Sequence, residues 1–273
     1  MSQEIPPEPE FMNPEPQLVV GVITLNEAGR IERCLESLRF AGHCVVLDAG
    51  SSDATVPLAR ALGARVEVRA DWRGFAVQRE RLLALMMEVH ASYFLMIDAD
   101  EVVSPALRDE ILSIVKSGRC GLWTVRWTQV AYGRELRGVV TRKAMPVLYS
   151  RGEVTAFYGV VHEYPVLPPG TAVIELKAPL LHFFRETVGD SLRKLTQYAL
   201  LGAAKRQKNR RRGGVWRGLA SGLAMFFRMY VLRRAFMQGG PGFLFSLFAG
   251  LEGFFRYAAL YYDHEHLNDR VLR

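Results

Sequence analysis

The stretch YFLMIDADEVV, residues 93–103, turns abruptly from apolar to acidic. Its first five residues predict a buried β-strand, and Asp98, Asp100 and Glu101 follow within four positions. Hard divalent cations take carboxylate oxygens as ligands, and alternate side chains of an extended segment point the same way. The stretch therefore predicts a strand that ends in a cation site. A solvated turn at a strand end is the alternative, because a D-x-D pattern alone is common by chance.

The residues before this stretch alternate apolar runs with segments of helical periodicity. Strands are predicted over residues 18–24, 44–47 and 65–68, and a helix over residues 75–90. Continuous apolar strands that alternate with helices are typical of a parallel sheet covered on both faces. The sequence therefore predicts an α/β fold with a mostly parallel sheet between helices.

Polar residues mark the ends of the predicted helices. Asn26 is expected to cap the helix after the first strand, and Ser52 or Asp53 the helix after the second, which Gly63 stops. Ser104, followed by a proline at the first helical position, is expected to open a helix after the acidic stretch.

Three predicted strands deliver polar side chains to the edge where such sheets bind ligands, beyond their carboxyl ends. Asp48 is placed to hydrogen-bond a ribose hydroxyl or a base N–H, and the helix start after it would face a phosphate. A plain helix cap is an equally good interpretation of Asp53. This convergence favours a binding site over a solvated turn, and its residues are Thr24, Asn26 and Glu27; Asp48, Ser51 and Asp53; and Asp98, Asp100 and Glu101.

Several classes of protein are disfavoured by the composition and the motifs that are absent from the chain. The sequence contains no G-x-G-x-x-G, no G-x-x-x-x-G-K-[ST] and no G-x-S-x-G, which disfavours hydride transfer, P-loop and Ser-His-Asp hydrolase chemistry. The start, MSQEIPPEPEFMNPEPQ, is acidic and proline-rich rather than signal-like, and residues 1–17 are predicted to be disordered. Cys34, Cys44 and Cys120 are predicted to be reduced core residues of a cytosolic protein.

Basic residues are concentrated near the C-terminus. The net charge is +7, and residues 191–234 hold twelve Lys or Arg and no Asp or Glu, so the remainder has 23 basic and 28 acidic residues. An uncharged stretch of 17 residues, 235–251, follows and contains Gly239-Gly240-Pro241-Gly242. Its length and this breaker argue against a membrane crossing, whereas basic and aromatic residues on apolar helices favour an anionic membrane surface. A solvated helix end and a nucleic-acid site are the alternatives, and long apolar helices argue against nucleic acid.

Four segments resemble, in order and spacing, the nucleotide-binding half of family 2 glycosyltransferases, which have the GT-A fold. They are VVGVITLNEAGRIERCLESL, VVLDAGSSDATVPLARALGA, DWRGFAVQRERLL and MIDADE. The block from Asp71 to Arg79, together with Leu148-Tyr149, Val161-His162-Glu163 and Leu181-His182, is similar to the lipopolysaccharide-core branch of β-glucosyltransferases. The resemblance runs from about Leu18 to Asp263.

This resemblance implies a role for each site residue. Thr24, Asn26, Glu27 and Asp48 would hold uracil and ribose, Asp98 the ribose, and Arg79, beside Gln78, the diphosphate or base. Asp100 would ligate Mg²⁺ or Mn²⁺. His182 would be a second metal ligand, which suits Mn²⁺ better, although a buried structural histidine is the alternative.

A base must take the acceptor proton when a sugar is transferred with inversion. Glu163, which follows an apolar strand, is the candidate base, with His162 as the fallback and Glu101 as the other contender.

The sequence thus predicts a catalytic domain over residues 18–190 and a helical, membrane-associating region over residues 191–273. Residues 18–119 would form the nucleotide-binding half and residues 120–190 the acceptor half. The expected partners are a UDP-sugar, a glycolipid such as the lipopolysaccharide inner core and an anionic membrane surface, but no nucleic acid. The expected location is cytoplasmic, peripheral on the inner face of the membrane. A polyprenyl-phosphate sugar synthase, a sugar nucleotidyltransferase and a non-catalytic adaptor are the alternatives.

Overall fold

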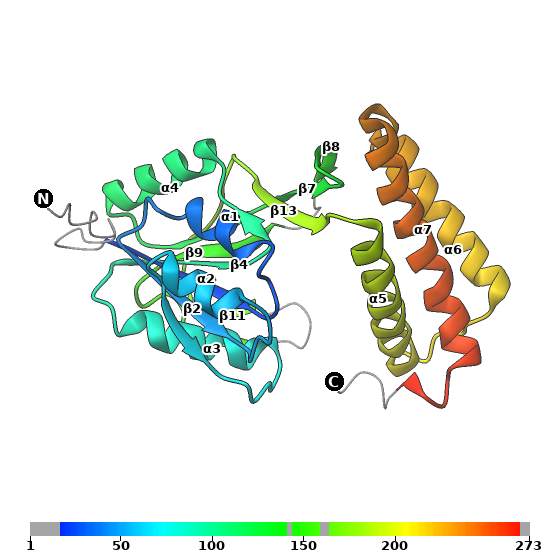
Figure 1. Cartoon of the computed structure of the whole chain (residues 1–273), viewed down its shortest axis with the longest axis horizontal. Helices are drawn as coiled ribbons and strands as arrows, with labels where there is room; N and C mark the ends of the chain where they lie inside the picture. Colours follow the sequence, from blue (N-terminus) through cyan, green and yellow to red (C-terminus); the bar gives the residue numbers. More distant parts are fainter. Residues whose placement is uncertain (1–16, 141–143, 159–163, 268–273) are drawn as a thin grey trace, which may run out of the picture. The chain divides into compact units, whose positions relative to one another are not determined.

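The computed structural model describes residues 17–140, 144–158 and 164–267, which form two compact units (Figure 1). The N-terminal unit comprises the chain up to Trp127 together with residues 141–182. The C-terminal unit comprises residues 128–140 and the chain from Phe183 onward. This division places residues 128–140 and 183–190 with the C-terminal helices.

A seven-stranded sheet forms the centre of the N-terminal unit. Its order is β12-β6-β9-β4-β1-β2-β3, and β1 pairs in parallel with both β2 and β4. Strand β9 is antiparallel to β4 and β6. The strands are β1 (Leu18–Thr24), β2 (His43–Asp48), β3 (Arg65–Val68), β4 (Tyr93–Asp98), β6 (Leu122–Val125), β9 (Met145–Ser150) and β12 (Val173–Glu175).

Helices cover both faces of this sheet because its central strands are apolar on both sides. Val20 and Val22 of β1 pack in a core with residues of α1 (Ile31–Glu36), α2 (Thr55–Ala61) and α4 (Pro105–Ser117). Val19 and Ile23 pack with residues of α3 (Phe75–Met87) on the opposite face. Gly21 permits this close packing, since a β-carbon there would lie 2.3 Å from the Met86 sulfur. The predicted fold class, a mostly parallel sheet between helices with a C-terminal helical region, is confirmed.

The predicted helix caps hold in part. Ser104 caps α4, and its hydroxyl accepts a hydrogen bond from the Leu107 N–H. Asn26 does not cap α1, because it adopts a left-handed conformation at φ 55° and its side chain bonds to the β2–α2 loop. The prediction for the cysteines was right for Cys34 and Cys44, which are buried, and wrong for Cys120, which is exposed in the turn after α4.

The remaining strands form two smaller sheets. One has the order β5-β13-β7-β8 and the other pairs β10 with β11. These strands are β5 (Glu101–Val102), β7 (Trp127–Ala131), β8 (Arg134–Val140), β10 (Ala156–Tyr158), β11 (Tyr164–Val166) and β13 (Leu180–Arg185).

Helices dominate the C-terminal unit: α5 (Val188–Lys208), α6 (Val215–Phe227) and α7 (Gly239–Tyr262). A π-helical turn, η1 (Arg228–Leu232), and a 3₁₀ turn, η2 (Ala235–Gln238), connect α6 to α7. A β-carbon on Gly222 would lie 2.8 Å from the Gly250 carbonyl oxygen, so glycines let α6 and α7 pack backbone to backbone. Stripes of small residues at such an interface are common in membrane helices.

The glycine-rich segment at residues 239–242 begins α7 and does not interrupt it. Pro241 lies in the first turn, where its missing N–H is tolerated. The 24-residue helix is about 36 Å long at 1.5 Å per residue. Among the described residues, Ala235–Tyr262 is long and apolar enough to cross a membrane, with a mean hydropathy of 1.3. The argument from length and a breaker against a crossing was therefore wrong, and peripheral attachment stays a prediction.

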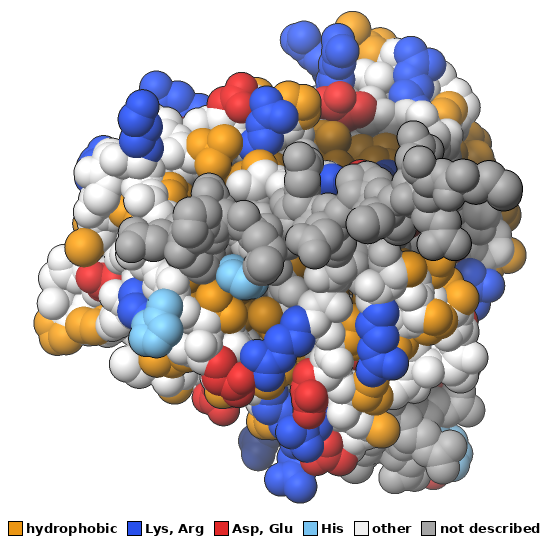
Figure 2. All heavy atoms as spheres, turned by 60° about the vertical axis from the view of Figure 1, so that its left-hand side comes forward, with side chains coloured by type: hydrophobic (Ala, Val, Ile, Leu, Met, Phe, Trp, Pro, Cys, Tyr) orange, Lys and Arg blue, Asp and Glu red, His pale blue; other side chains and the backbone are white. Residues whose placement is uncertain are grey.

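Charged side chains of both signs are mixed on the face of the molecule drawn in Figure 2. Lys and Arg form several separate groups there, some of them next to Asp and Glu and to hydrophobic patches. This face is therefore not uniformly basic despite the net charge of +7.

Candidate donor site at the strand ends

The carboxyl ends of β1, β2 and β4 lie at one edge of the sheet. Thr24 is paired in register with Asp48, and Ile23 with Asp98. The loops that follow these strands therefore begin side by side, as the sequence predicts, and carry the polar residues to a common edge.

Backbone and side-chain hydrogen bonds join the first two of these loops. The Asn26 N–H donates to the Ser51 hydroxyl at 2.8 Å, and the Asn26 amide oxygen accepts from the Ser52 N–H at 2.9 Å. The Glu27 N–H donates to the Thr55 hydroxyl at 2.8 Å. Asn26 thus holds the two loops together, and its left-handed conformation, which asparagine tolerates better than most residues, makes this possible.

The carboxylate of Asp48 organises the turn after β2. It is fully buried and accepts from the N–H groups of Gly50 and Ser51, at 2.9 and 2.7 Å, and from the Ser51 hydroxyl at 2.5 Å. Gly50 adopts φ 96°, which favours glycine. Asp48 is therefore placed to shape the loop of the predicted nucleotide site.

Asp53 lies at the start of α2, with both carboxylate oxygens bonded to backbone groups. It accepts from the Thr55 N–H at 3.0 Å and from the Ala28 N–H at 3.1 Å. Burial alone would raise the pKa of Asp53, but the hydrogen bonds from Thr55 and Ala28 outweigh it and hold the pKa below its ordinary value. The predicted cap of α2 by Ser52 or Asp53 is therefore wrong, because Ala54 occupies the N-cap position and no side chain caps the helix. Asp53 instead joins the two loops through its bonds to Thr55 and Ala28.

Gln78 and Arg79, at the start of α3, belong to the Asp71–Arg79 block. The Arg79 guanidinium donates to Asp98 Oδ1 at 2.8 Å, so this ion pair joins α3 to the end of β4. Gln78 is buried, and its amide nitrogen has no hydrogen-bond partner within the described part of the chain. The same holds for the hydroxyl of Thr24. Buried polar groups of this kind are uncommon in folded proteins and are suited to bonding a ligand.

His182 is brought to the acidic stretch by strand pairing. Strand β13 runs antiparallel to β5 and places His182 opposite Glu101. The Nε2 atom of His182 lies 3.3 Å from Asp100 Oδ2, and both side chains are largely buried. The Trp127 ring packs on the imidazole with its centroid 4.8 Å away. Asp100 and His182, the two predicted metal ligands, are therefore adjacent.

The buried side chain of Glu101 stabilises the turn that carries Asp98 and Asp100. It is buried, and its Oε2 atom accepts from the Asp98 N–H at 2.9 Å, which fixes the backbone of the D-x-D turn. Burial, with further contributions from the carboxylates of Asp98 and Asp100, raises the pKa of Glu101 well above its ordinary value.

The residues that could bind a cation are few. Among the described residues, no group of three or more His, Cys, Asp or Glu side chains is arranged to hold a metal ion. Asp100 and His182 fit a cation that takes its remaining ligands from a substrate, since Mg²⁺ commonly uses one or two carboxylates together with substrate phosphates. The predicted base Glu163 and its fallback His162 lie outside the described residues.

Comparison with known proteins identifies the family. The profile of "Glycosyl transferase family 2" matches residues 19–163, which is more than half of the chain. The chain belongs to this family. The predicted family and the predicted enzyme class, a glycosyltransferase, are therefore confirmed, which removes the nucleotidyltransferase and adaptor alternatives.

Relatives in bacteria extend this match. The lipopolysaccharide core biosynthesis glycosyltransferase LpsC of Rhizobium meliloti is 25% identical over 260 residues, which cover 93% of this chain and 95% of LpsC. An uncharacterized glycosyltransferase of Rickettsia bellii is 40% identical over 97 residues, which are 35% of this chain and 32% of that protein. A solved structure of glucosyl-3-phosphoglycerate synthase from Mycobacterium tuberculosis with phosphoglyceric acid has a TM-score of 0.47 and 19% identity, covering 65% of this chain and 75% of that one.

Proposed function

We propose that this glycosyltransferase transfers a sugar, with inversion, from a UDP-sugar to a membrane glycolipid such as the lipopolysaccharide inner core. The observation that carries this proposal is the meeting of Asp100 and His182 at the end of β4, next to the Arg79–Asp98 ion pair. Asp100 and His182 could ligate a metal cation, and the Arg79 guanidinium pairs with the Asp98 carboxylate beside them. Such groups at the ends of parallel strands suit a donor that carries a diphosphate.

The donor would lie across the ends of β1, β2 and β4. Thr24, Asn26, Glu27 and Asp48 would surround the nucleoside, and the unpartnered Thr24 hydroxyl offers a hydrogen bond to it. Asp98 would accept from a ribose hydroxyl, while Arg79 would donate to the diphosphate. Ser51 and Asp53 would hold the two loops in place, and the unpartnered Gln78 amide nitrogen would donate a hydrogen bond to the donor.

Asp100 and His182 would hold Mn²⁺ or Mg²⁺. When bound, the cation would offset the charge that develops on the departing diphosphate. His182 favours Mn²⁺, since imidazole suits transition metals better than Mg²⁺. Glu101 would keep the D-x-D turn in the geometry that presents Asp100, through its hydrogen bond to the Asp98 N–H.

Glu163 would act as the base. The acceptor hydroxyl oxygen would attack the anomeric carbon while the bond from that carbon to the diphosphate oxygen breaks, and the hydroxyl proton would pass to the Glu163 carboxylate. This role rests on the sequence alone, with His162 as the fallback.

The acceptor is proposed from LpsC, whose similarity spans nearly the whole of both chains. A lipid-linked acceptor fits a C-terminal unit that combines the apolar helices α6 and α7 with twelve basic residues between positions 191 and 234. We place the enzyme at the cytoplasmic face of the membrane, where sugar nucleotides are made.

A transfer assay tests this function. The purified enzyme is given radiolabelled UDP-glucose, UDP-galactose or GDP-mannose with Mn²⁺, and either truncated lipopolysaccharide or a polyprenyl phosphate as acceptor. Transfer of sugar from a UDP-sugar to the lipopolysaccharide supports the proposal, and a product labile to mild acid on the polyprenyl phosphate would favour the synthase alternative. Turnover with GDP-mannose alone would refute the UDP assignment.

A further inference from the structure

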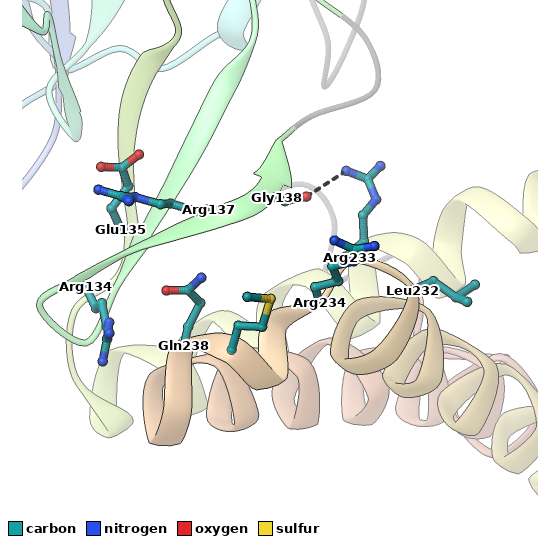
Figure 3. Close-up of a pocket in the computed structure, with 9 residues that line it drawn as sticks. Arg134, Glu135, Arg137, Gly138, Leu232, Arg233, Arg234 and Gln238 are labelled. Atoms are coloured by element: carbon teal, nitrogen blue, oxygen red, sulfur yellow. Dashed lines mark hydrogen bonds between the residues drawn. The ribbon is translucent and has the colours of Figure 1, made fainter.

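The C-terminal unit contains an open cavity of about 650 Å³ that four arginines line (Figure 3). Arg134 and Arg137 come from β8, and Arg233 and Arg234 from the segment between η1 and η2. We call this cavity the arginine pocket. It lies outside the donor site, and the proposed reaction uses none of these residues.

Packing fixes the two walls of the pocket against each other. Leu136 and Val139 of β8 form a small core with Ala235 and Phe245. The Arg233 guanidinium donates to the Gly138 carbonyl oxygen at 3.4 Å, the interaction drawn as a dashed line in Figure 3.

The backbone of the second wall has two unusual features. Arg234 adopts a left-handed conformation at φ 55°, and η1 is a π-helical turn. Both features are uncommon for such residues and often occur at functional sites. They shape the segment that carries Arg233 and Arg234.

Charge in the pocket is unbalanced. The lining contains four arginines and a single carboxylate residue, Glu135, so its formal charge is +3. Among the described residues, the guanidinium groups of Arg134, Arg137 and Arg234 form no ion pair. Guanidinium groups match phosphate oxygens with two parallel hydrogen bonds, so the complementary ligand is a phosphate group.

An apolar stripe on α6 leads to this pocket. Trp216, Leu219, Leu223 and Phe227 are exposed and lie three or four positions apart, which places them on one helix face. Leu232, 66% exposed, follows at the edge of the pocket. The opposite face of α6 packs on α7 through Gly218 and Gly222, which leaves the stripe open. An exposed apolar helix face with basic residues at its end is typical of a helix that lies in a membrane interface.

We propose that the arginine pocket binds the phosphate of an anionic phospholipid headgroup while the α6 stripe lies in the adjacent acyl region. The proposal rests on the membrane location proposed above and names the lipid contact that produces it. The apolar stripe beside the pocket is what selects a lipid phosphate over a soluble one. The helical segment formed by α6 and η1, residues 215–232, is about 26 Å long. The basic run at residues 205–212 precedes this segment, whereas the pocket lies at its other end.

Vesicle binding by the full chain tests this proposal. The triple variant Arg134→Gln/Arg137→Gln/Arg234→Gln is compared with the native protein by co-sedimentation with phosphatidylglycerol/phosphatidylcholine vesicles and with pure phosphatidylcholine vesicles. The matched control, Arg210→Gln/Arg211→Gln/Arg212→Gln, removes the same charge from exposed positions before α6. Far-ultraviolet circular dichroism checks that each variant keeps its helices.

The pocket variant should bind phosphatidylglycerol vesicles more than about 100-fold more weakly, since it loses about fivefold for each arginine at an anionic surface and, in addition, the paired hydrogen bonds to the phosphate. The control loses only the general surface attraction, so its loss should be at most about 100-fold and clearly smaller than that of the pocket variant. The change Arg134→Lys/Arg137→Lys/Arg234→Lys should fall between the native protein and the Gln variant, because it keeps charge without paired hydrogen bonds. Equal losses of vesicle binding in the Gln variant and its control would overturn the proposal, since they would show that total positive charge, and not the pocket, determines binding. Unchanged vesicle binding would also overturn it, including the case in which the pocket binds inorganic phosphate. The pocket variant and its control should bind UDP as the native protein does. A failure of the proposed donor site would therefore be seen in UDP binding, and a failure of the pocket proposal in vesicle binding.

Discussion

Arg185 of β13 forms a buried ion pair whose removal has a calculable cost. Its side chain is 1% exposed, its guanidinium pairs with Glu252 of α7, and it donates to the Ser191 carbonyl oxygen at 3.2 Å. The guanidinium also lies 4.9 Å from the Phe184 ring centroid and 5.3 Å from that of Phe248. This one side chain therefore joins β13, α5 and α7 within the C-terminal unit.

Arg185→Met keeps most of the apolar volume and leaves the Glu252 carboxylate buried without its cation. Breaking a buried pair in this way costs about 3–5 kcal/mol, and the lost hydrogen bond to Ser191 is part of that cost. We expect the free energy of unfolding to fall by about 4 kcal/mol. Arg185→Met/Glu252→Leu should recover most of the loss, because replacing both charges of a buried pair by apolar groups is often neutral.

Urea unfolding followed by circular dichroism at 222 nm measures this effect, since α5, α6 and α7 supply most of the helical signal of the unit. Arg193→Met is the matched control, because Arg193 on α5 is 79% exposed and lies 3.8 Å from Asp190. The control should change stability by less than about 0.5 kcal/mol. A loss of under about 1 kcal/mol for Arg185→Met, or no recovery in the double variant, would contradict a stabilising role for the buried Arg185–Glu252 pair.

Three further predictions concern packing, the donor loop and the thiols. Gly222→Leu should lower the stability of the C-terminal unit by about 1–3 kcal/mol, because its β-carbon would lie 2.8 Å from an α7 carbonyl oxygen; an unchanged urea midpoint would contradict the close packing. Asp48→Ala removes three hydrogen bonds and should abolish UDP binding in calorimetry, with a loss of about 2–3 kcal/mol in stability; intact UDP binding would show that the turn does not depend on Asp48. A thiol reagent at pH 8 should modify one cysteine in the native protein and three after unfolding. Cys120 is exposed, whereas burial raises the pKa of Cys44 to about 12 and that of Cys34 well above its ordinary value. Rapid modification of two or three cysteines in the native protein would contradict the structure.

The edge of the sheet that carries the candidate site could be predicted from the sequence, because parallel pairing aligns strand ends. The apolar runs at residues 18–24 and 93–97 are buried on both faces, so their position in a parallel sheet followed from composition alone. Asp48 and Asp98 then had to lie at the same edge.

Other features depend on contacts between distant segments, which no local pattern reports. His182 meets Asp100 through the pairing of β13 with the two-residue strand β5, and Trp127 packs on His182 from 55 positions away. Asn26 resembled a helix cap locally, but its amide serves a loop 26 positions further along. The segment at residues 239–242 carried a helix-breaking composition, yet a proline and glycines in a first turn permit a helix start.

The arginine pocket had no sequence signal either. Two of its arginines come from β8 and two from the segment about 100 positions later, and the core of Leu136 and Ala235 brings them together. The sequence located basic character between residues 191 and 234, but it could not include Arg134 and Arg137.

Calorimetric titration of UDP in the presence and absence of Mn²⁺ decides whether Asp100 helps to hold a cation for the nucleotide. It is made on the native protein, on Asp100→Ala and on the control Asp109→Ala, whose carboxylate is exposed on α4. We expect Mn²⁺-dependent binding of UDP, in preference to GDP and CMP, that is lost in Asp100→Ala and kept in Asp109→Ala. Binding that is equally tight without Mn²⁺ or in Asp100→Ala, or no binding of any nucleotide by the folded native protein, would contradict it.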